Sequence, residues 1–142
     1  IYEYLKVVPE IEYYITTSWV MKHVKGDYTV HHCHTNSIFS GVVYIEVDEN
    51  TGGIKFTRDA KCYNIWPPAL QADTTTGFLS RITSDEWTVI PKNGDMLIWP
   101  SHLVHEVHPN TSDLERYALA FNVYLKGTFG GFKTPQPFFI QL

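Results

Sequence analysis

The chain has 142 residues, which is enough for one compact domain but not for two of ordinary size. Apolar residues make up 44% of it and charged residues only 18%, so it can bury a sizeable core and is not of the disordered class. The net charge is −4 and the Lys and Arg residues are scattered, which argues against nucleic acid or an anionic membrane as the main partner. We expect a soluble, cytoplasmic protein, because the apolar runs are far shorter than a membrane span.

The first part of the chain is dominated by alternating patterns that are typical of strands. Only Ile1–Val8 has a weakly helical pattern. In Ile11–Trp19 both alternating sets of side chains are rich in β-branched and aromatic residues, which predicts a strand. A second strand is predicted at Ser40–Val47, and the turn-forming run Asp48–Gly53 separates it from a short third strand at Ile54–Thr57.

The later part of the chain continues the same rhythm. The segments Thr88–Pro91 and Met96–Trp99 flank Lys92–Asp95, whose Asn-Gly pair suits the positive φ angles of a tight turn, so we predict a hairpin. The last strands are predicted at Val104–His108 and Arg116–Lys126. Short strands at this close spacing predict an all-β domain, either a sandwich or a jelly-roll barrel.

Two segments do not follow the strand pattern. We interpret the long stretch Asp59–Glu86 either as a lid over a functional site or as a surface excursion packed down by its own apolar side chains. The tail Gly127–Leu142 predicts an irregular arm that covers a sheet edge or a partner in a homodimer. Because the first residue is Ile1 rather than Met, the sequence is compatible with a longer natural chain that has a further N-terminal segment.

Histidines are concentrated in two short stretches of the sequence. Six of the seven lie there: His31, His32 and His34, then His102, His105 and His108. Alternate residues of an extended segment share a face, so His32 and His34 can chelate one ion while His31 points the other way. A third ligand from the second cluster would complete a site for Zn, Fe, Cu or Ni. The alternative interpretation is that these are exposed or hydrogen-bonded core histidines without a metal.

The strand predicted at Arg116–Lys126 offers a second chemical feature. Its alternation places Arg116, Ala118 and Ala120 on one face, and we expect the other face to be core. A guanidinium beside two small side chains leaves room for a bound carboxylate, which Arg can hold with two parallel hydrogen bonds. The alternative is an edge-strand Arg whose head group reaches into water.

Motifs spread over most of the chain carry a family resemblance. They are Ser18-Trp19, His32-x-His34, Asn36-Ser37, Ser40-Gly41, Tyr44, Gly94-Asp95, Trp99-Pro100-Ser101, His105, Pro109-Asn110, Arg116 and Phe121-Asn122. In this order they resemble the Fe(II)/2-oxoglutarate-dependent oxygenase superfamily, and most closely a family of 2OG-Fe(II) oxygenases of marine bacteria and phages that is related to the prolyl hydroxylases. The likeness extends from about Ser18 to Gly127, and it assigns no role to Asn36, Ser40 or Asn122.

From the length we expect a single domain over residues 1–142. The resemblance implies that it folds as a double-stranded β-helix, with Fe(II) as cofactor and 2-oxoglutarate as co-substrate. By position, His32 and His105 would be metal ligands, Arg116 would bind the far carboxylate of 2-oxoglutarate, and Tyr44 would assist it. The chain departs from the superfamily at His34, where a metal-binding carboxylate is usual, so the metal site would consist of three histidines.

Two functions from different classes remain open at this point. The first is a dioxygenase that hydroxylates an unknown small molecule or peptide through an atypical three-His site. The second is a catalytically silent, metal-binding β-sandwich that acts as a small-molecule binding or structural module. Production of succinate from 2-oxoglutarate separates them, because only the enzyme consumes the co-substrate.

Overall fold

The computed structural model describes residues 12–57, 86–129 and 138–140. Within these ranges all regular structure is β-strand, and no helix there is long and apolar enough to cross a membrane. The helix expected at Ile1–Val8 lies outside the described residues, as does nearly all of the long stretch Asp59–Glu86.

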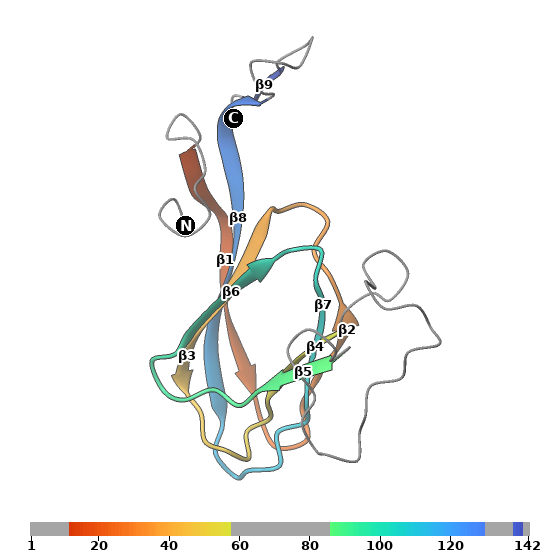
Figure 1. The fold of residues 1–142 in the computed structure, drawn as a ribbon. Coiled ribbons are helices and arrows are strands. Elements are labelled where there is room, and N and C mark those ends of the chain that lie inside the picture. The colour runs from red at the N-terminus through yellow and green to blue at the C-terminus, as the bar shows by residue number, and fades with distance from the viewer. Residues whose placement is uncertain (1–11, 58–85, 130–137, 141–142) are drawn as a thin grey trace, which may run out of the picture.

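The larger of two sheets is built around the long strand β8 (Figure 1). Its strands lie in the order β1 (Glu12–His23), β8 (Arg116–Phe129), β3 (Phe39–Glu46) and β6 (Met96–Pro100), all antiparallel. A short strand, β9 (Phe138–Ile140), pairs with the far end of β8. The prediction of an irregular tail at Gly127–Leu142 is therefore wrong in part. Its first residues continue β8, and β9 pairs with them.

The smaller sheet contains the remaining strands in the order β2 (Thr29–His32), β7 (Val104–Val107), β4 (Ile54–Thr57) and β5 (Glu86–Val89). From β2 to β8 the chain passes repeatedly from one sheet to the other, so strands that follow each other in sequence rarely pair. Two antiparallel sheets connected in this way form a jelly roll, which confirms the predicted all-β fold class.

The prediction of a hairpin around Asn93-Gly94 is wrong, although the turn itself is present. Gly94 has the positive φ that the sequence indicates, at 86°. Its N–H donates to the Tyr44 carbonyl at 2.8 Å, and the Asn93 side chain accepts from the Val47 N–H at 2.7 Å. Since the turn is bound to the end of β3, β5 pairs with β4 in one sheet and β6 pairs with β3 in the other.

The core fills the space between the two sheets. Its buried members are Val42, Tyr44, Val47, Ile54, Trp99, Val107 and Ala118. Ala118 shares its face of β8 with Arg116, so the core forms on that face, whereas Tyr117 and Leu119 of the opposite face are only half-buried. The expectation that the opposite face of β8 is the core was therefore wrong for this part of the strand.

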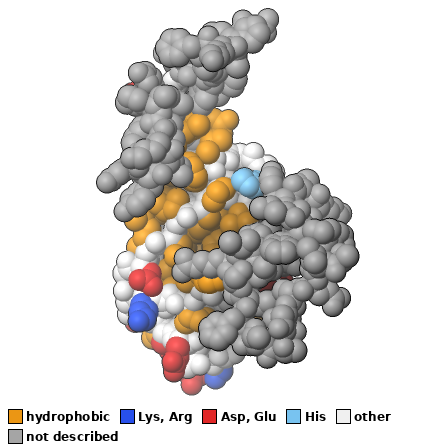
Figure 2. All heavy atoms as spheres, in the orientation of Figure 1, with side chains coloured by type: hydrophobic (Ala, Val, Ile, Leu, Met, Phe, Trp, Pro, Cys, Tyr) orange, Lys and Arg blue, Asp and Glu red, His pale blue; other side chains and the backbone are white. Residues whose placement is uncertain are grey.

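The outward face of the larger sheet is also partly apolar. Strand alternation directs Val20, Ile45, Met96 and Ile98 away from the core, and each is more than a third exposed. Figure 2 shows apolar side chains gathered in a band on the viewed face, with charged side chains near its lower end. Because both faces of these strands carry apolar residues, hydrophobic alternation alone does not tell the inside of the sheet from the outside.

Gly41 on β3 should be intolerant of any side chain. A Cβ added there would overlap the ring of Phe121 on β8, which is itself 8% exposed. We expect Gly41→Ala to lower the free energy of unfolding by about 2 kcal/mol, the usual cost of overpacking a core. Chemical denaturation measures it, and Phe121→Leu should relieve the loss. A Gly41→Ala variant as stable as wild type would contradict this packing.

Candidate metal centre

Backbone pairing places two of the predicted ligands opposite each other. His32 is the last residue of β2, and in the β2–β7 register it faces His105. Their ring centroids are 4.3 Å apart. Cross-strand partners are held at this spacing by the ladder itself, so the approach of the two imidazoles follows from the pairing of β2 with β7.

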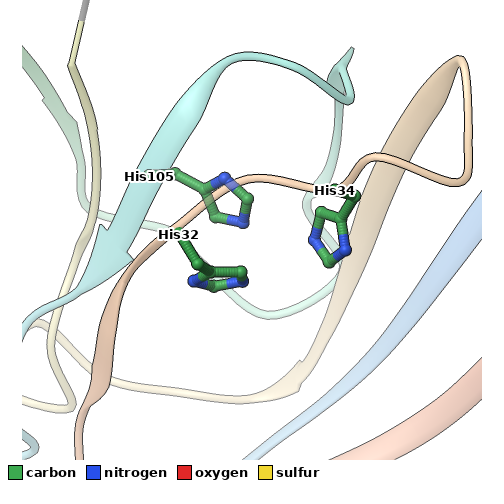
Figure 3. A group of neighbouring side chains, drawn as sticks. All are labelled: His32, His34 and His105. Atoms are coloured by element: carbon green, nitrogen blue, oxygen red, sulfur yellow. The ribbon is translucent and has the colours of Figure 1, made fainter.

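The third histidine lies beyond the strand. β2 ends at His32, so the expectation that His32 and His34 share a strand face was wrong in its local geometry. The loop nevertheless turns His34 toward the other two rings, at centroid distances of 5.1 Å from His32 and 5.3 Å from His105 (Figure 3). One nitrogen of each ring lies within 4.8 Å of the others, close enough for one ion to contact all three after small side-chain rotations.

Local hydrogen bonds set the tautomers of two of the rings. His32 Nδ1 lies 2.7 Å from the Val30 carbonyl, and His105 Nδ1 lies 3.0 Å from the Leu103 carbonyl. A carbonyl oxygen can only accept, so each Nδ1 carries the hydrogen and each Nε2 keeps a free lone pair in the neutral ring. A histidine that ligates a metal is usually oriented through its other ring nitrogen in this way, so the donor set fits a metal ion.

Burial keeps two of the three imidazoles, those of His34 and His105, in their neutral, ligand-competent form. His105 is 4% exposed, and the Trp99 ring packs edge-on against it at 4.9 Å. This burial lowers the pKa of His105 to about 4, a shift that the Leu103 carbonyl opposes and the nearby His32 and His34 increase. Burial, helped by His32, also lowers the pKa of His34. Neutral imidazole is the form that binds a metal, so His34 and His105 are ready to do so at neutral pH.

A pocket extends from the three histidines into the space between the sheets. It encloses about 450 Å³, counting the part open to solvent. The histidines line it together with Tyr44 and Arg116, and its other side chains are mostly apolar, among them Trp19, Met21, Val42, Ile54, Trp99 and Ala120. No acidic side chain is among these described lining residues. Such a wall favours a ligand that carries negative charge.

Arg116 is the buried cation of this pocket. It is 2% exposed, donates one hydrogen bond to the Gly52 carbonyl at 3.2 Å, and lies 5.4 Å from the centre of the Tyr44 ring. Within the described part of the chain it has no carboxylate partner. Of its two alanine neighbours, Ala120 lines the pocket and Ala118 belongs to the core. Arg116 is thus not the water-facing Arg of the alternative interpretation.

Tyr44 lies against this guanidinium on the pocket wall. It is fully buried, and its hydroxyl has no hydrogen-bond partner within the described residues. Burial raises the pKa of Tyr44 to about 12, although Arg116 opposes the rise, so the hydroxyl keeps its proton and can donate it to a ligand.

The other histidines of the two sequence clusters do not belong to this group of three. His31 and His102 are exposed, and His108 is near Glu106 at 3.8 Å. The rings of Trp99 and Phe56 pack around His105, a contact that the sequence pattern did not predict. Strand alternation on β6 is compatible with an inward-facing Trp99, but its contact with His105 depends on how the two sheets pack.

The sequence and the fold can be compared with those of known proteins. Residues 17–122 match the model of a family described as "putative 2OG-Fe(II) oxygenase". Among curated protein sequences, none matches the chain.

Three solved structures illustrate the likeness of fold. An oxidoreductase of the 2OG-Fe(II) oxygenase family from Burkholderia pseudomallei has a TM-score of 0.57 and 15% identity over 80% of this chain and 45% of that one. HygX from Streptomyces hygroscopicus, solved with nickel and 2-oxoglutarate bound, has a TM-score of 0.54 and 12% identity over 79% and 57%. A prolyl-4-hydroxylase from Pseudomonas putida has a TM-score of 0.50 and 18% identity over 75% and 50%. The chain thus spans about half the length of these proteins, and at such identities the likeness shows the fold alone.

The burial of His105 should make the metal-free protein sensitive to acid. Its pKa is about 4 in the folded state and about 6.5 when exposed, so the unfolded state binds more protons between these values. Stability should therefore fall as the pH drops from about 6.5 to 4, by up to about 3 kcal/mol from this residue. Urea denaturation of the metal-free protein at a series of pH values measures this loss.

A matched pair of variants isolates the contribution of His105. His105→Gln cannot gain the charge and should have a flatter stability profile, whereas the same change at the half-exposed His108 should leave the acid sensitivity in place. If His105→Gln and wild type lost stability in parallel, the buried imidazole would not be its source.

Proposed function

The chain belongs to the putative 2OG-Fe(II) oxygenase family, a family of oxidoreductases, and on that premise we propose that it is a non-haem Fe(II)-dependent dioxygenase. It would use 2-oxoglutarate as co-substrate to hydroxylate a small molecule or peptide. The observation that carries the proposal is one pocket with three imidazoles on its wall and a buried guanidinium that has no carboxylate partner among the described residues. When bound, Fe(II) would supply the activation of O2.

In this proposal the three histidines form the metal site. His32, His34 and His105 would each present one ring nitrogen to the ion. For His32 and His105 this is Nε2, since Nδ1 is committed to a backbone carbonyl. Borderline metals such as Fe(II), Ni(II) and Zn(II) accept imidazole nitrogen, so the ligand set does not by itself select among them.

Arg116 and Tyr44 would hold the co-substrate. The guanidinium offers a planar pair of donors that matches a carboxylate, and the Tyr44 hydroxyl offers a third. A buried cation without an anion is costly, so the site gains most from a ligand that brings negative charge to Arg116. The far carboxylate of 2-oxoglutarate meets this requirement.

The replacement of the usual carboxylate by His34 changes the charge of the site. Three neutral ligands leave a divalent ion with its full charge of +2, whereas two histidines and a carboxylate would leave +1. With Arg116 nearby, a dianion such as 2-oxoglutarate is well matched to the pocket. The same replacement is also the observation that favours the second candidate function, a metal-dependent binding module without turnover.

Turnover without substrate tests the choice between them. We expect the Fe(II)-loaded protein to release succinate slowly from 2-oxoglutarate in the presence of O2, and His32→Ala, which removes a ligand, to release none above the free-iron background. Mass spectrometry of the reaction measures succinate directly. If wild type binds Fe(II) and 2-oxoglutarate but forms no more succinate than His32→Ala, the binding module is the better account.

Loss of the Arg116 guanidinium should weaken 2-oxoglutarate binding selectively. We expect Arg116→Ala to cost at least ~2 kcal/mol of binding free energy, which is typical when one partner of a buried charge pair is removed. Arg116→Lys should restore only part of it, since an ammonium cannot make the paired hydrogen bonds. Calorimetric titration of 2-oxoglutarate into the Ni(II)-loaded protein measures both.

Two comparisons make the Arg116 experiment specific. Metal content should be unchanged in both variants, because no metal ligand is altered. Lys25→Ala removes an exposed cation that pairs with Asp113 and should leave the affinity as it is. Equal affinity of wild type and Arg116→Ala for 2-oxoglutarate would remove the co-substrate assignment.

A further inference from the structure

His34 differs from the other two histidines in how it is held. His32 and His105 lie on paired strands, whereas His34 lies in the loop between β2 and β3. One backbone bond fixes its position directly, from the His34 N–H to the Ser101 carbonyl at 2.9 Å. The Ser101 N–H in turn donates to the Ile38 carbonyl at 2.9 Å, so the loop is attached at two points to the single residue Ser101.

A chain of side-chain hydrogen bonds continues from this contact into the larger sheet. The Ser101 hydroxyl lies 2.8 Å from that of Ser37 and 2.9 Å from that of Ser40. Ser40 donates to the Asn122 side-chain oxygen at 2.9 Å, and the Asn122 amide donates to Thr17 at 3.3 Å. These hydrogen bonds therefore link the loop that carries His34 to β3, β8 and β1.

The number of available hydrogens fixes which hydroxyl donates and which accepts in this series of hydrogen bonds. Each hydroxyl has a single hydrogen, and that of Ser40 is directed to Asn122. Ser40 must then accept from Ser101, and Ser101, whose hydrogen is used, must accept from Ser37. The hydroxyls of Ser37, Ser101 and Ser40 thus each donate to the next member of the network. Removal of any one of them leaves a neighbour without a hydrogen-bond partner.

Three members of this network are buried, which makes it costly to disturb, whereas Ser37 is half-buried. Ser40 and Ser101 are each 1% exposed and Asn122 is 5% exposed, so water cannot easily replace a lost partner. Satisfied buried networks of this kind rigidify a structure and specify its geometry. Ser40 also lines the pocket, whereas Ser37 and Ser101 do not, so these two act on the site only through the loop.

We propose that the Ser37–Ser101–Ser40–Asn122 chain positions His34 for metal binding. The inference rests on the proposed function, since it needs a metal at the three histidines. Ser37 and Ser101 are positioning residues in this account: they touch no ligand, and they fix the loop so that the His34 ring faces His32 and His105.

Cobalt binding to single variants tests the proposal. We expect Ser37→Ala and Ser101→Ala to weaken Co(II) affinity about 10-fold or more, as is typical when the groups that orient a ligand are lost. The visible absorption spectrum of bound Co(II) should change as well, because it reports the ligand geometry. Ser37→Thr, which keeps the hydroxyl, should bind as wild type does.

A matched control is available at Ser112. Its half-buried hydroxyl donates to Asp48 at 2.7 Å, away from the pocket, so Ser112→Ala removes a comparable hydrogen bond and should leave Co(II) affinity and spectrum unchanged. Thermal unfolding of every variant shows whether the fold is retained.

A double-variant cycle separates positioning from general support of the fold. In a His34→Ala background, Ser37→Ala should cause no further loss of Co(II) affinity, because the residue it positions is already absent. An equal loss in both backgrounds, or unchanged binding and spectrum in Ser37→Ala and Ser101→Ala, would overturn the inference alone. Wild-type protein that bound no Co(II) would overturn the proposed function and this inference with it.

Discussion

The antiparallel register of β2 with β7 is the constraint on which the site depends. It places His32 opposite His105, and each ring bonds through Nδ1 to the carbonyl of the residue two positions earlier in the sequence. Two of the three candidate ligands are thus brought together by the pairing of two strands of the smaller sheet. Arg116 and Tyr44 come from the larger sheet, so the pocket exists only because the two sheets pack together.

Charge gives this pocket its chemical character. A guanidinium is buried at one position and imidazoles that burial keeps neutral lie at another, and none of the described lining residues is acidic. A pocket with this charge favours an anionic ligand, and a bound divalent cation would strengthen that preference. In the proposed function, a histidine in place of the usual metal-binding carboxylate would increase this excess of positive charge, and a dianionic co-substrate would then match a ligand set that carries no charge of its own.

Much of the strand pattern could be predicted from alternation and turn residues. The bounds of β4 agree with the predicted strand, and β3 differs by one residue at each end. The hairpin at Gly94 failed because local turn chemistry does not determine which sheet each flanking strand joins. The inner face of β8 was misjudged because both faces of the larger sheet carry apolar side chains.

The residues of the candidate site could be predicted from the sequence, but the contacts that hold one of them in place could not. His32, His34, His105, Arg116 and Tyr44 could be named from spacing and resemblance, and all five line one pocket, while their roles as ligands stay predictions. The fixing of His34 could not be predicted, since Ser37 and Ser101 are 64 residues apart and meet only in the folded chain.

The most direct test of the account is anomalous diffraction from crystals grown with Ni(II) and 2-oxoglutarate. The account predicts one metal peak within bonding distance of a ring nitrogen of His32, His34 and His105, with the far carboxylate of 2-oxoglutarate on Arg116. A structure in which His34 turns away from the ion, or in which the ion binds elsewhere, would contradict the three-histidine site.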